Sequence, residues 1–501
     1  MIEVLSEARR RRAVSSQMPP EGARMLEGCE LSEEKASALR RRCRNGCMWR
    51  GRRTRIADRP NLLVASGGSR AAKKEVDAGR LSPSLFARLD LSHGDKFASL
   101  LQGVLDVDSL PDPTNKITLA RRLADDLNLY RVTCPVGVLL IIFEARPEVV
   151  VQISCLAIKS GNAVILKGGK EAAESNRVLF AVLREALEDV GREFAAENKV
   201  AGVTHDDDDD DDDEDVETAT RANQPFPIPP TAIQLVSTRS QIATLLTLDT
   251  YIDLVIPRGS KSLVQYIQSS TRIPVLGHAD GVCSVFIDAS ADVDKAVKVV
   301  VDAKTSYPAA CNSAETLVVH RKALPTVLPK LAAALVNHGV QLRADQESHA
   351  CLASLNIPST PATPDDLTTE HLSLTLTLVT VASLAAAITH INTHGSHHTD
   401  VIVTEKKKRA ERFMRDVDAA GVFWNASSRF ADGFRYGFGA EIGVSTNKTH
   451  ARGPVGLAGL LIYKYRLYGA AGHASAAYGV SGHQTPYLHQ DIDGVHGVED
   501  L

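Results

Sequence analysis

The chain has 501 residues, of which 44% are hydrophobic and 24% charged, with a formal net charge of −4. This composition supports a normal buried core, the length favours about three domains, and the charge excludes a globally basic nucleic-acid-binding protein. No apolar run is long enough to cross a bilayer, and the first residues lack the apolar segment of a secretory signal. Eight cysteines without paired spacing are typical of a reducing compartment rather than a disulfide scaffold.

Residues 1–65 differ from the rest of the chain. Arginines cluster in 9–12 and 40–55, and few apolar positions repeat with a helical or strand period. A basic patch for an anionic surface would use these arginines. An organellar presequence is less compatible, because such peptides are poor in acids and this segment contains several glutamates. The composition favours a disordered leader.

From about residue 135 the pattern alternates between strands and helices. Apolar runs predict strands at 138–143, 163–166, 252–256 and 283–287, and helical patterns cover 147–159, 175–187, 263–267 and 293–303. Strand, glycine-containing turn and helix in repetition predict a parallel α/β sheet. In such sheets, ligands bind beyond the carboxyl ends of the strands.

Two glycine turns follow predicted strands, Gly168-Gly169 and Gly259-Ser260. Each can bring backbone N–H groups and a helix N-terminus close to a phosphate, although neither matches the GxGxxG or Walker pattern and tight turns also use glycine. Lys167 adds a cation at the end of its strand, suited to a ribose hydroxyl or a phosphate. These residues are candidates for a cofactor-binding edge.

The strand at 138–143 ends in Glu144, Ala145, Arg146 and Pro147. An ion pair between Glu144 and a neighbour, with Arg146 on the surface, is a common arrangement at the end of an element. Alternatively, Arg146 faces an anionic substrate, because the planar guanidinium fits a phosphate or a carboxylate. Both interpretations stay open from the residues alone.

An acid tract occupies 206–217 and is followed by a proline-rich stretch. Like charges at this density repel one another and stay solvated, so we expect residues 201–223 to be a surface insertion. A metal-binding role is disfavoured, because nothing fixes the geometry of the carboxylates.

Cys311 is the strongest candidate for a reactive group. It lies on a short connector between a predicted helix, 293–303, and a predicted strand, 316–319, and small residues keep that connector open to a substrate. An ordinary thiol has a pKa of about 8.5, so a nucleophilic cysteine needs help from its surroundings. A buried, inert cysteine is the common alternative.

Residues 425–457 are dense in glycine and polar residues. This density exceeds what turns alone require and indicates a binding loop. Arg429, Arg435 and Arg452 within it are candidate contacts for an anionic substrate.

Together these segments resemble the γ-glutamyl phosphate reductases, the glutamate-5-semialdehyde dehydrogenases of proline synthesis in the aldehyde dehydrogenase superfamily. The resemblance covers about residues 66–480 and corresponds to the stand-alone fungal type. It is carried, in the family's order, by 135–147, 159–171, 251–260, 306–316, 395–400 and 425–457. Residues 1–65 and the acid tract depart from the family pattern.

The resemblance implies an aldehyde dehydrogenase-like α/β fold in which a Rossmann-like cofactor domain adjoins an α/β catalytic domain and a small oligomerisation arm. We expect the NADP-binding domain at 66–280, the catalytic domain at 281–455, and the oligomerisation strand and tail at 456–501. It also implies a cytoplasmic homo-oligomer that acts on L-glutamyl 5-phosphate, with glutamate 5-kinase as a candidate partner and no membrane, nucleic acid or metal.

By the same resemblance, Cys311 attacks L-glutamyl 5-phosphate, phosphate leaves, and NADPH reduces the thioester to glutamate 5-semialdehyde. Arg146 and the Cys311 backbone N–H are the candidate oxyanion donors, and Glu144, Asn425, Arg429 and Arg452 the candidate substrate contacts. Cofactor roles fall to Lys167, Gly168, Gly169, Gly259, Ser260 and, in the nicotinamide-ribose position, Glu370.

Oxidising relatives carry a water-activating glutamate upstream of the cysteine, and the matching stretch here, 277–281, lacks it. A reductase gains from that absence, because water would hydrolyse the thioester, although Asp280 could still act as a base. An NAD(P)-dependent dehydrogenase for another aldehyde is the alternative enzyme. A scaffold or nucleic-acid-binding protein built on an inactive reductase is disfavoured by the intact Cys311, Arg146 and Lys167.

Overall fold

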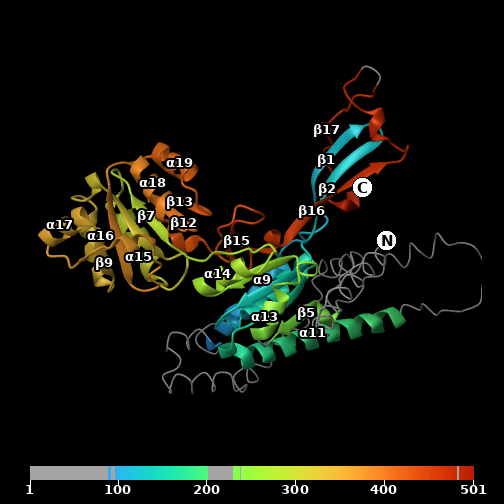
Figure 1. Cartoon of the computed structure of the whole chain (residues 1–501), viewed down its shortest axis with the longest axis horizontal. Helices are drawn as coiled ribbons and strands as arrows, with labels where there is room; N and C mark the ends of the chain where they lie inside the picture. The colour runs from blue at the N-terminus through green and yellow to red at the C-terminus, as the bar shows by residue number, and fades with distance from the viewer. Residues whose placement is uncertain (1–88, 92–95, 201–228, 237–238, 482–483, 501) are drawn as a thin grey trace, which may run out of the picture.

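The computed structural model describes residues 89–91, 96–200, 229–236, 239–481 and 484–500. The arginine-rich leader and the acid tract lie outside these residues. Figure 1 shows two α/β bodies and an arm that projects away from both. Among the described residues, no helix has the length and apolar character needed to cross a bilayer.

The first body is built on a four-stranded parallel sheet with the order β5-β4-β3-β6. Its strands are β3 (Val138–Phe143), β4 (Ala163–Lys167), β5 (Ile233–Val236) and β6 (Leu254–Arg258). The central strands are almost continuously buried, as expected when helices cover both faces of a parallel sheet.

Alternate residues of β3 face two separate apolar clusters, because successive strand side chains point to opposite faces. Leu139 and Ile141 pack in the cluster of α9 (Lys96–Ser109), α10 (Val149–Ser160) and α11 (Ala173–Val200). Leu140 and Ile142 pack in the cluster that includes α13 (Arg239–Leu245) and α14 (Lys261–Ser270). The sheet is therefore rigid where its carboxyl end carries the candidate residues.

The second body is a seven-stranded parallel sheet with the order β10-β9-β11-β8-β7-β12-β13. Its strands are β7 (Cys283–Ile287), β8 (Ala314–His320), β9 (Gln341–Ala344), β10 (Thr360–Pro361), β11 (Thr375–Val381), β12 (Thr399–Val403) and β13 (Gly421–Trp424). One face packs on α15 (Val293–Thr305), α16 (Leu328–Asn337) and α17 (Gln346–Ser354), and the other on α18 (Leu384–His394) and α19 (Lys407–Asp416).

The predicted elements are confirmed, with small shifts at most of their ends and one long extension, that of α11. The strand expected at 252–256 is β6 and begins two residues later, because the chain is still turning at Ile252. The helix expected over 175–187 is α11, which already begins at Ala173 because a 3₁₀ turn, Lys170–Ala172, leads directly into it, and which continues to Val200.

The arm is an antiparallel sheet with the order β16-β2-β1-β17. Its strands are β1 (Ile117–Ala124), β2 (Leu127–Pro135), β16 (Leu461–Gly469) and β17 (Gln490–Asp491). The division expected from the sequence placed 117–135 in the cofactor domain, whereas these residues form a hairpin of the arm. β16 pairs along the whole of β2, because the hairpin would otherwise leave an open edge.

Candidate active site

Cys311 lies where the sequence predicts, on the connector 306–313 between α15 and β8. The connector packs closely on the segment that leads into β7: a Cβ atom at Gly281 would lie 2.1 Å from the Cys311 carbonyl oxygen. Glycine is therefore required at 281 for this close approach. The Cys311 side chain is partly buried and lines a cavity of about 760 Å³.

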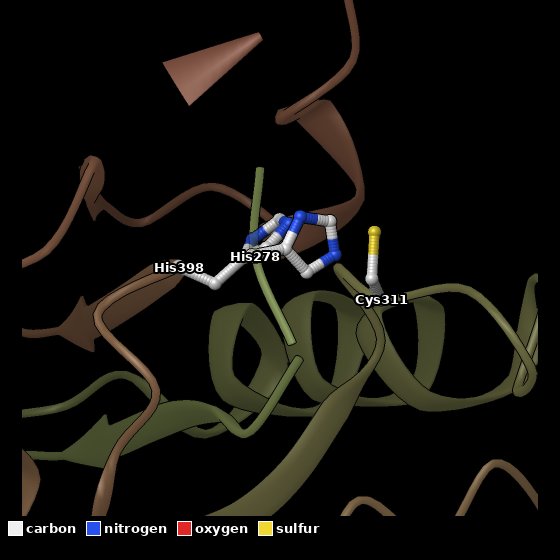
Figure 2. Close-up of side chains that lie close together, drawn as sticks. All are labelled: His278, Cys311 and His398. Carbon is white, nitrogen blue, oxygen red and sulfur yellow. The ribbon is translucent and has the colours of Figure 1, made fainter. Parts of the chain in front are cut away.

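Two histidines from other segments meet Cys311. His278 precedes β7, and His398 directly precedes β12. One nitrogen of each ring and the cysteine sulfur all lie within 4.8 Å of one another. Figure 2 shows both rings on the same side of Cys311, and their centroids are 4.8 Å apart in an edge-to-face arrangement.

Hydrogen bonds fix both rings. Nδ1 of His278 lies 2.7 Å from the carbonyl oxygen of Val444, which can only accept, so Nδ1 carries the proton and Nε2 is left for the thiol. Nδ1 of His398 contacts the Thr399 hydroxyl at 3.0 Å and the sulfur of Cys283 at 3.7 Å. Nε2 of His398 is buried without a hydrogen-bond partner in the described part of the chain.

The two histidines change the acidity of the thiol. Burial by itself raises the pKa of Cys311, but His398 and His278 outweigh burial and hold this pKa well below its ordinary value. Burial lowers the pKa of His278, but Cys311 outweighs it and raises that pKa. In contrast, burial raises the pKa of Cys155 to about 12 and that of Cys283 well above its usual value. Among these buried thiols, Cys311 is the one poised to be a thiolate at neutral pH.

The cavity beside Cys311 brings together residues that the sequence identified separately. Those that line it are Glu144, Arg146, Gly259, Ser260, Cys311 and Glu370. They come from the carboxyl ends of β3 and β6, from the connector after α15, and from the segment before β11. The cavity therefore joins the ends of the two parallel sheets, where the ligand of such a fold is expected.

The Gly259-Ser260 turn is held by Glu144. The backbone N–H of Ser260 donates to Oε2 of Glu144 at 2.9 Å, and a Cβ atom at Gly259 would lie 2.5 Å from the same oxygen. The turn leads into α14, whose first residue, Lys261, also lines the cavity. A helix N-terminus, a side-chain hydroxyl and a lysine on one wall fit a diphosphate.

Glu370 lines the same cavity. Burial, followed by the charge of Cys311, raises its pKa to about 7. The segment that carries Glu370 is tied to the second body, because the N–H of Leu372 donates to Glu315 at 3.4 Å. Its position near the cysteine agrees with a role beside the reacting end of a cofactor.

Lys167, Gly168 and Gly169 do not line the cavity. Lys167 is buried at the end of β4. A Cβ atom at Gly168 would lie 2.0 Å from the Asn176 amide and 3.2 Å from the Phe143 ring, so packing alone requires this glycine. Their cofactor role stays a prediction.

The three substrate-binding candidates that the resemblance implies in 425–457 make contacts within the fold. Asn425 bonds both the N–H and the carbonyl oxygen of Thr404. Arg452 pairs with Asp418 at 3.0 Å. Arg429 donates to Ser306 at 3.0 Å and to Asn312, so it braces the connector of Cys311 from both ends. None of the three lines the main cavity, and their substrate roles stay predictions.

Sequence reasoning missed three residues of the site, His278, His398 and Arg258. His398 stood in 395–400, a segment that carries the family resemblance, and His278 in 277–281, which was considered only for its missing glutamate and for Asp280. Arg258 ends β6, lines the cavity, and has a buried Nε without a partner in the described residues. Asp280, considered as a base, pairs with Lys261 at 2.6 Å, and His278 is the residue of this stretch that meets Cys311.

The donor set of His278, His398 and Cys311 is one that Zn²⁺ also accepts, since structural and catalytic zinc sites use histidine nitrogen and cysteine sulfur. A metal here and a nucleophilic thiolate would be competing uses of the same sulfur.

Comparison with known proteins decides the family. The model of the aldehyde dehydrogenase family matches residues 217–351. A probable γ-glutamyl phosphate reductase of Schizosaccharomyces pombe is 49% identical, covering 88% of this chain and 90% of that protein. The γ-glutamyl phosphate reductase of a Picosynechococcus species is 48% identical, covering 82% and 86%.

A crystal structure of γ-glutamyl phosphate reductase from Thermotoga maritima superposes with a TM-score of 0.73 at 32% identity, covering 88% of this chain and 99% of that one. The chain belongs to the γ-glutamyl phosphate reductase family. This membership confirms the expected aldehyde dehydrogenase-like α/β fold, the enzyme class, glutamate-5-semialdehyde dehydrogenase, and the place in proline biosynthesis. As a dehydrogenase of this superfamily, the enzyme uses a nicotinamide cofactor.

Proposed function

We propose that the enzyme reduces L-glutamyl 5-phosphate through a thioester on Cys311. The thiolate attacks the acyl carbon, the bond from that carbon to the phosphate oxygen breaks, and phosphate leaves with the electron pair. Covalent catalysis of this kind splits one difficult substitution into two easier steps. The observation that carries the proposal is the Cys311 thiol, its pKa held low by two histidines, on the wall of a cavity that also contains the Gly259-Ser260 turn.

The charge that develops on the acyl oxygen needs hydrogen-bond donors. Arg146 lines the cavity with Cys311, and the Cys311 backbone N–H is the second candidate. The N–H of Ala145, between Glu144 and Arg146, is not available, because it donates to Glu171 at 2.7 Å. Arg258 adds a second guanidinium to the cavity, suited to the leaving phosphate.

NADPH, when bound, supplies the hydride that reduces the thioester, and glutamate 5-semialdehyde is then released as the thiolate departs. Gly259, Ser260 and Lys261 would hold the diphosphate at the N-terminus of α14, and Glu370 would hold the ribose nearer the cysteine. His278 and His398 would stabilise the departing thiolate by the same charges that lower its pKa. Asp280, held by Lys261, is a poor base for the water that would waste the thioester.

The finer expectations belong to this proposal as well. They are a preference for NADPH over NADH, a cytoplasmic location, and glutamate 5-kinase as the partner that supplies the substrate. A homo-oligomer is supported by β16, where Tyr463, Tyr465 and Leu467 alternate along the strand, share one face and are each at least 56% exposed. Such an exposed apolar face on a projecting arm is typical of a surface that meets another subunit.

The reverse reaction tests the function. Purified enzyme should oxidise glutamate 5-semialdehyde with NADP⁺ only when inorganic phosphate is added, because phosphate must attack the thioester to release the product. Formation of NADPH is followed by its absorbance. Turnover without phosphate would instead support the second candidate, a dehydrogenase for another aldehyde that hydrolyses its thioester.

A further inference from the structure

A second cavity, of about 520 Å³, adjoins the first. Ala145 and Arg146 line both, so the two cavities meet at the turn that ends β3. Tyr307, on the connector of Cys311, lines the second cavity as well. The second cavity contains no residue of the Gly259-Ser260 turn, and so it extends from the reacting region in a different direction from the cofactor edge.

Glu148 is the unusual residue of this second cavity. Its Oε2 atom is buried and has no hydrogen-bond partner in the described part of the chain. Burial, only partly offset by a hydrogen bond from its own backbone N–H and by the charges of Arg146 and Lys96, raises the pKa of its carboxyl group. A buried carboxylate oxygen without a donor is costly, and this cost is recovered if a ligand supplies the donor.

The other polar groups of this cavity are cationic or neutral. Lys96, from the first residue of α9, presents an ammonium, and Gln152 and Ser99 add neutral donors and acceptors. Arg146, which the two cavities share, is assigned to the acyl oxygen; the rest of the lining offers one carboxylate, one ammonium and neutral amide and hydroxyl groups, a set complementary to a zwitterion. The α-amino-acid end of the substrate is such a group, and its α-carbon is three bonds from the acyl carbon that Cys311 attacks.

We propose that the second cavity binds the α-amino-acid end of the substrate. Glu148 accepts hydrogen bonds from its ammonium group, and Lys96 pairs with its carboxylate. This inference deepens the proposed function and rests on it. It assigns substrate recognition to Glu148, Lys96 and Gln152 rather than to Asn425 and Arg452, which bond within the fold.

This arrangement predicts which substrate analogues the enzyme rejects. A site whose buried polar groups are matched by the substrate rejects analogues that lack those groups, because the groups are then left without partners. An aldehyde without the amino group leaves Glu148 without this donor, and one without the carboxylate forgoes the ion pair with Lys96. Removing the matching protein group should therefore remove the discrimination between the aldehydes that carry the substrate group and those that lack it.

The test uses the full-length enzyme in the phosphate-dependent reverse reaction with three aldehydes. Glutamate 5-semialdehyde carries both groups, 5-oxopentanoate lacks the amino group, and butanal lacks both. Glu148→Gln should lower kcat/KM for the semialdehyde about tenfold or more, the effect of a lost charged hydrogen bond, mainly through KM. It should leave 5-oxopentanoate and butanal unchanged. Lys96→Met should lower kcat/KM for the two aldehydes that carry a carboxylate, glutamate 5-semialdehyde and 5-oxopentanoate, and leave kcat/KM for butanal unchanged.

Two surface changes are the matched controls. Glu174→Gln removes a carboxylate that pairs with Arg177 on the outside of α11, and Lys298→Met removes an exposed ammonium from α15. Neither should alter any of the three kcat/KM values.

An equal loss on all three aldehydes in Glu148→Gln would overturn the inference while leaving the proposed function intact. The proposed function fails separately, if wild-type turnover does not need phosphate. Should Glu148→Gln not fold, Glu148→Asp keeps the charge and withdraws it by one methylene. It should raise KM for the semialdehyde alone, and an unchanged KM would again overturn the inference.

Discussion

Two buried polar clusters lie at the connector 306–313 and serve different purposes. At its ends, Lys304 of α15 and Glu315 of β8 form an ion pair of 2.7 Å with both side chains fully buried. In its middle, Cys311 meets His278 and His398, one ring nitrogen has no partner in the described residues, and the group opens on a cavity. The first cluster is closed and satisfied, and the second is open and unsatisfied.

The difference shows where buried charge is structural and where it is chemical. Burial raises the pKa of Glu315 to about 7, against the opposing effect of Lys304, and burial lowers the pKa of Lys304. Each partner thus compensates the other, and neither lines the main cavity. For Cys311, in contrast, the surroundings favour the charged nucleophile itself, which is typical of a functional site.

The largest expected effect separates two cysteines of the same neighbourhood. Cys311→Ser should lower reductase turnover by at least about 10³-fold while cofactor binding stays nearly unchanged, because an alkoxide is rarely available at neutral pH. Cys283→Ser is the matched control. Its buried thiol donates to the Cys311 carbonyl oxygen at 3.3 Å, a bond that serine can keep, so activity should stay within about tenfold. Activity of Cys311→Ser in that range would remove Cys311 from its role.

Substitutions in the closed cluster, Lys304 and Glu315, should change the stability of the fold. Lys304→Met leaves Glu315 as an uncompensated buried charge and should lower the free energy of unfolding by about 3–5 kcal/mol, measured by urea denaturation. Replacing Glu315 with leucine in the same chain should recover most of that loss. If the double variant is no more stable than Lys304→Met alone, the pair is not the self-contained unit described here.

A substitution of Arg146 tests whether the cavity beside the open cluster stabilises the oxyanion. Arg146→Lys keeps the charge but loses the planar, two-pronged geometry, and kcat/KM should fall about 10²-fold in both directions, the size typical of a lost oxyanion donor. NADPH binding, measured by fluorescence titration, should not change. A comparable loss in cofactor affinity would place Arg146 at the cofactor instead.

Substitution of His398 should have the smallest effect, a change in the pH dependence of Cys311 reactivity. His398 stabilises the thiolate and so lowers the pKa of Cys311; removing it should raise that pKa, by about one unit for each 1.4 kcal/mol of lost interaction. Alkylation by iodoacetamide follows the thiolate, so His398→Gln should slow it near neutral pH and move its profile to higher pH. His390→Gln, a histidine of α18 whose pKa burial lowers to about 4, is the control. Identical profiles for both variants would contradict the thiolate–histidine interaction.

The sequence by itself determined the local elements and the place of the nucleophile. Continuous apolar runs gave β3 and β7 their bounds, the helical pattern located α15, and small residues between α15 and β8 marked Cys311 as accessible. These signals lie within short windows, because the spacing of apolar residues differs between a strand and a helix.

Only the tertiary structure decided what surrounds Cys311. His398 contacts Cys283 across 115 residues of sequence, and this neighbourhood exists because β12 lies beside β7 and β7 beside β8 in the parallel sheet. Likewise, the strand order brought Glu144 to Ser260 and Asn425 to Thr404. No local period encodes strand order, so the histidines that activate the cysteine and the cavity that contains Glu148 emerge only when the sheets assemble.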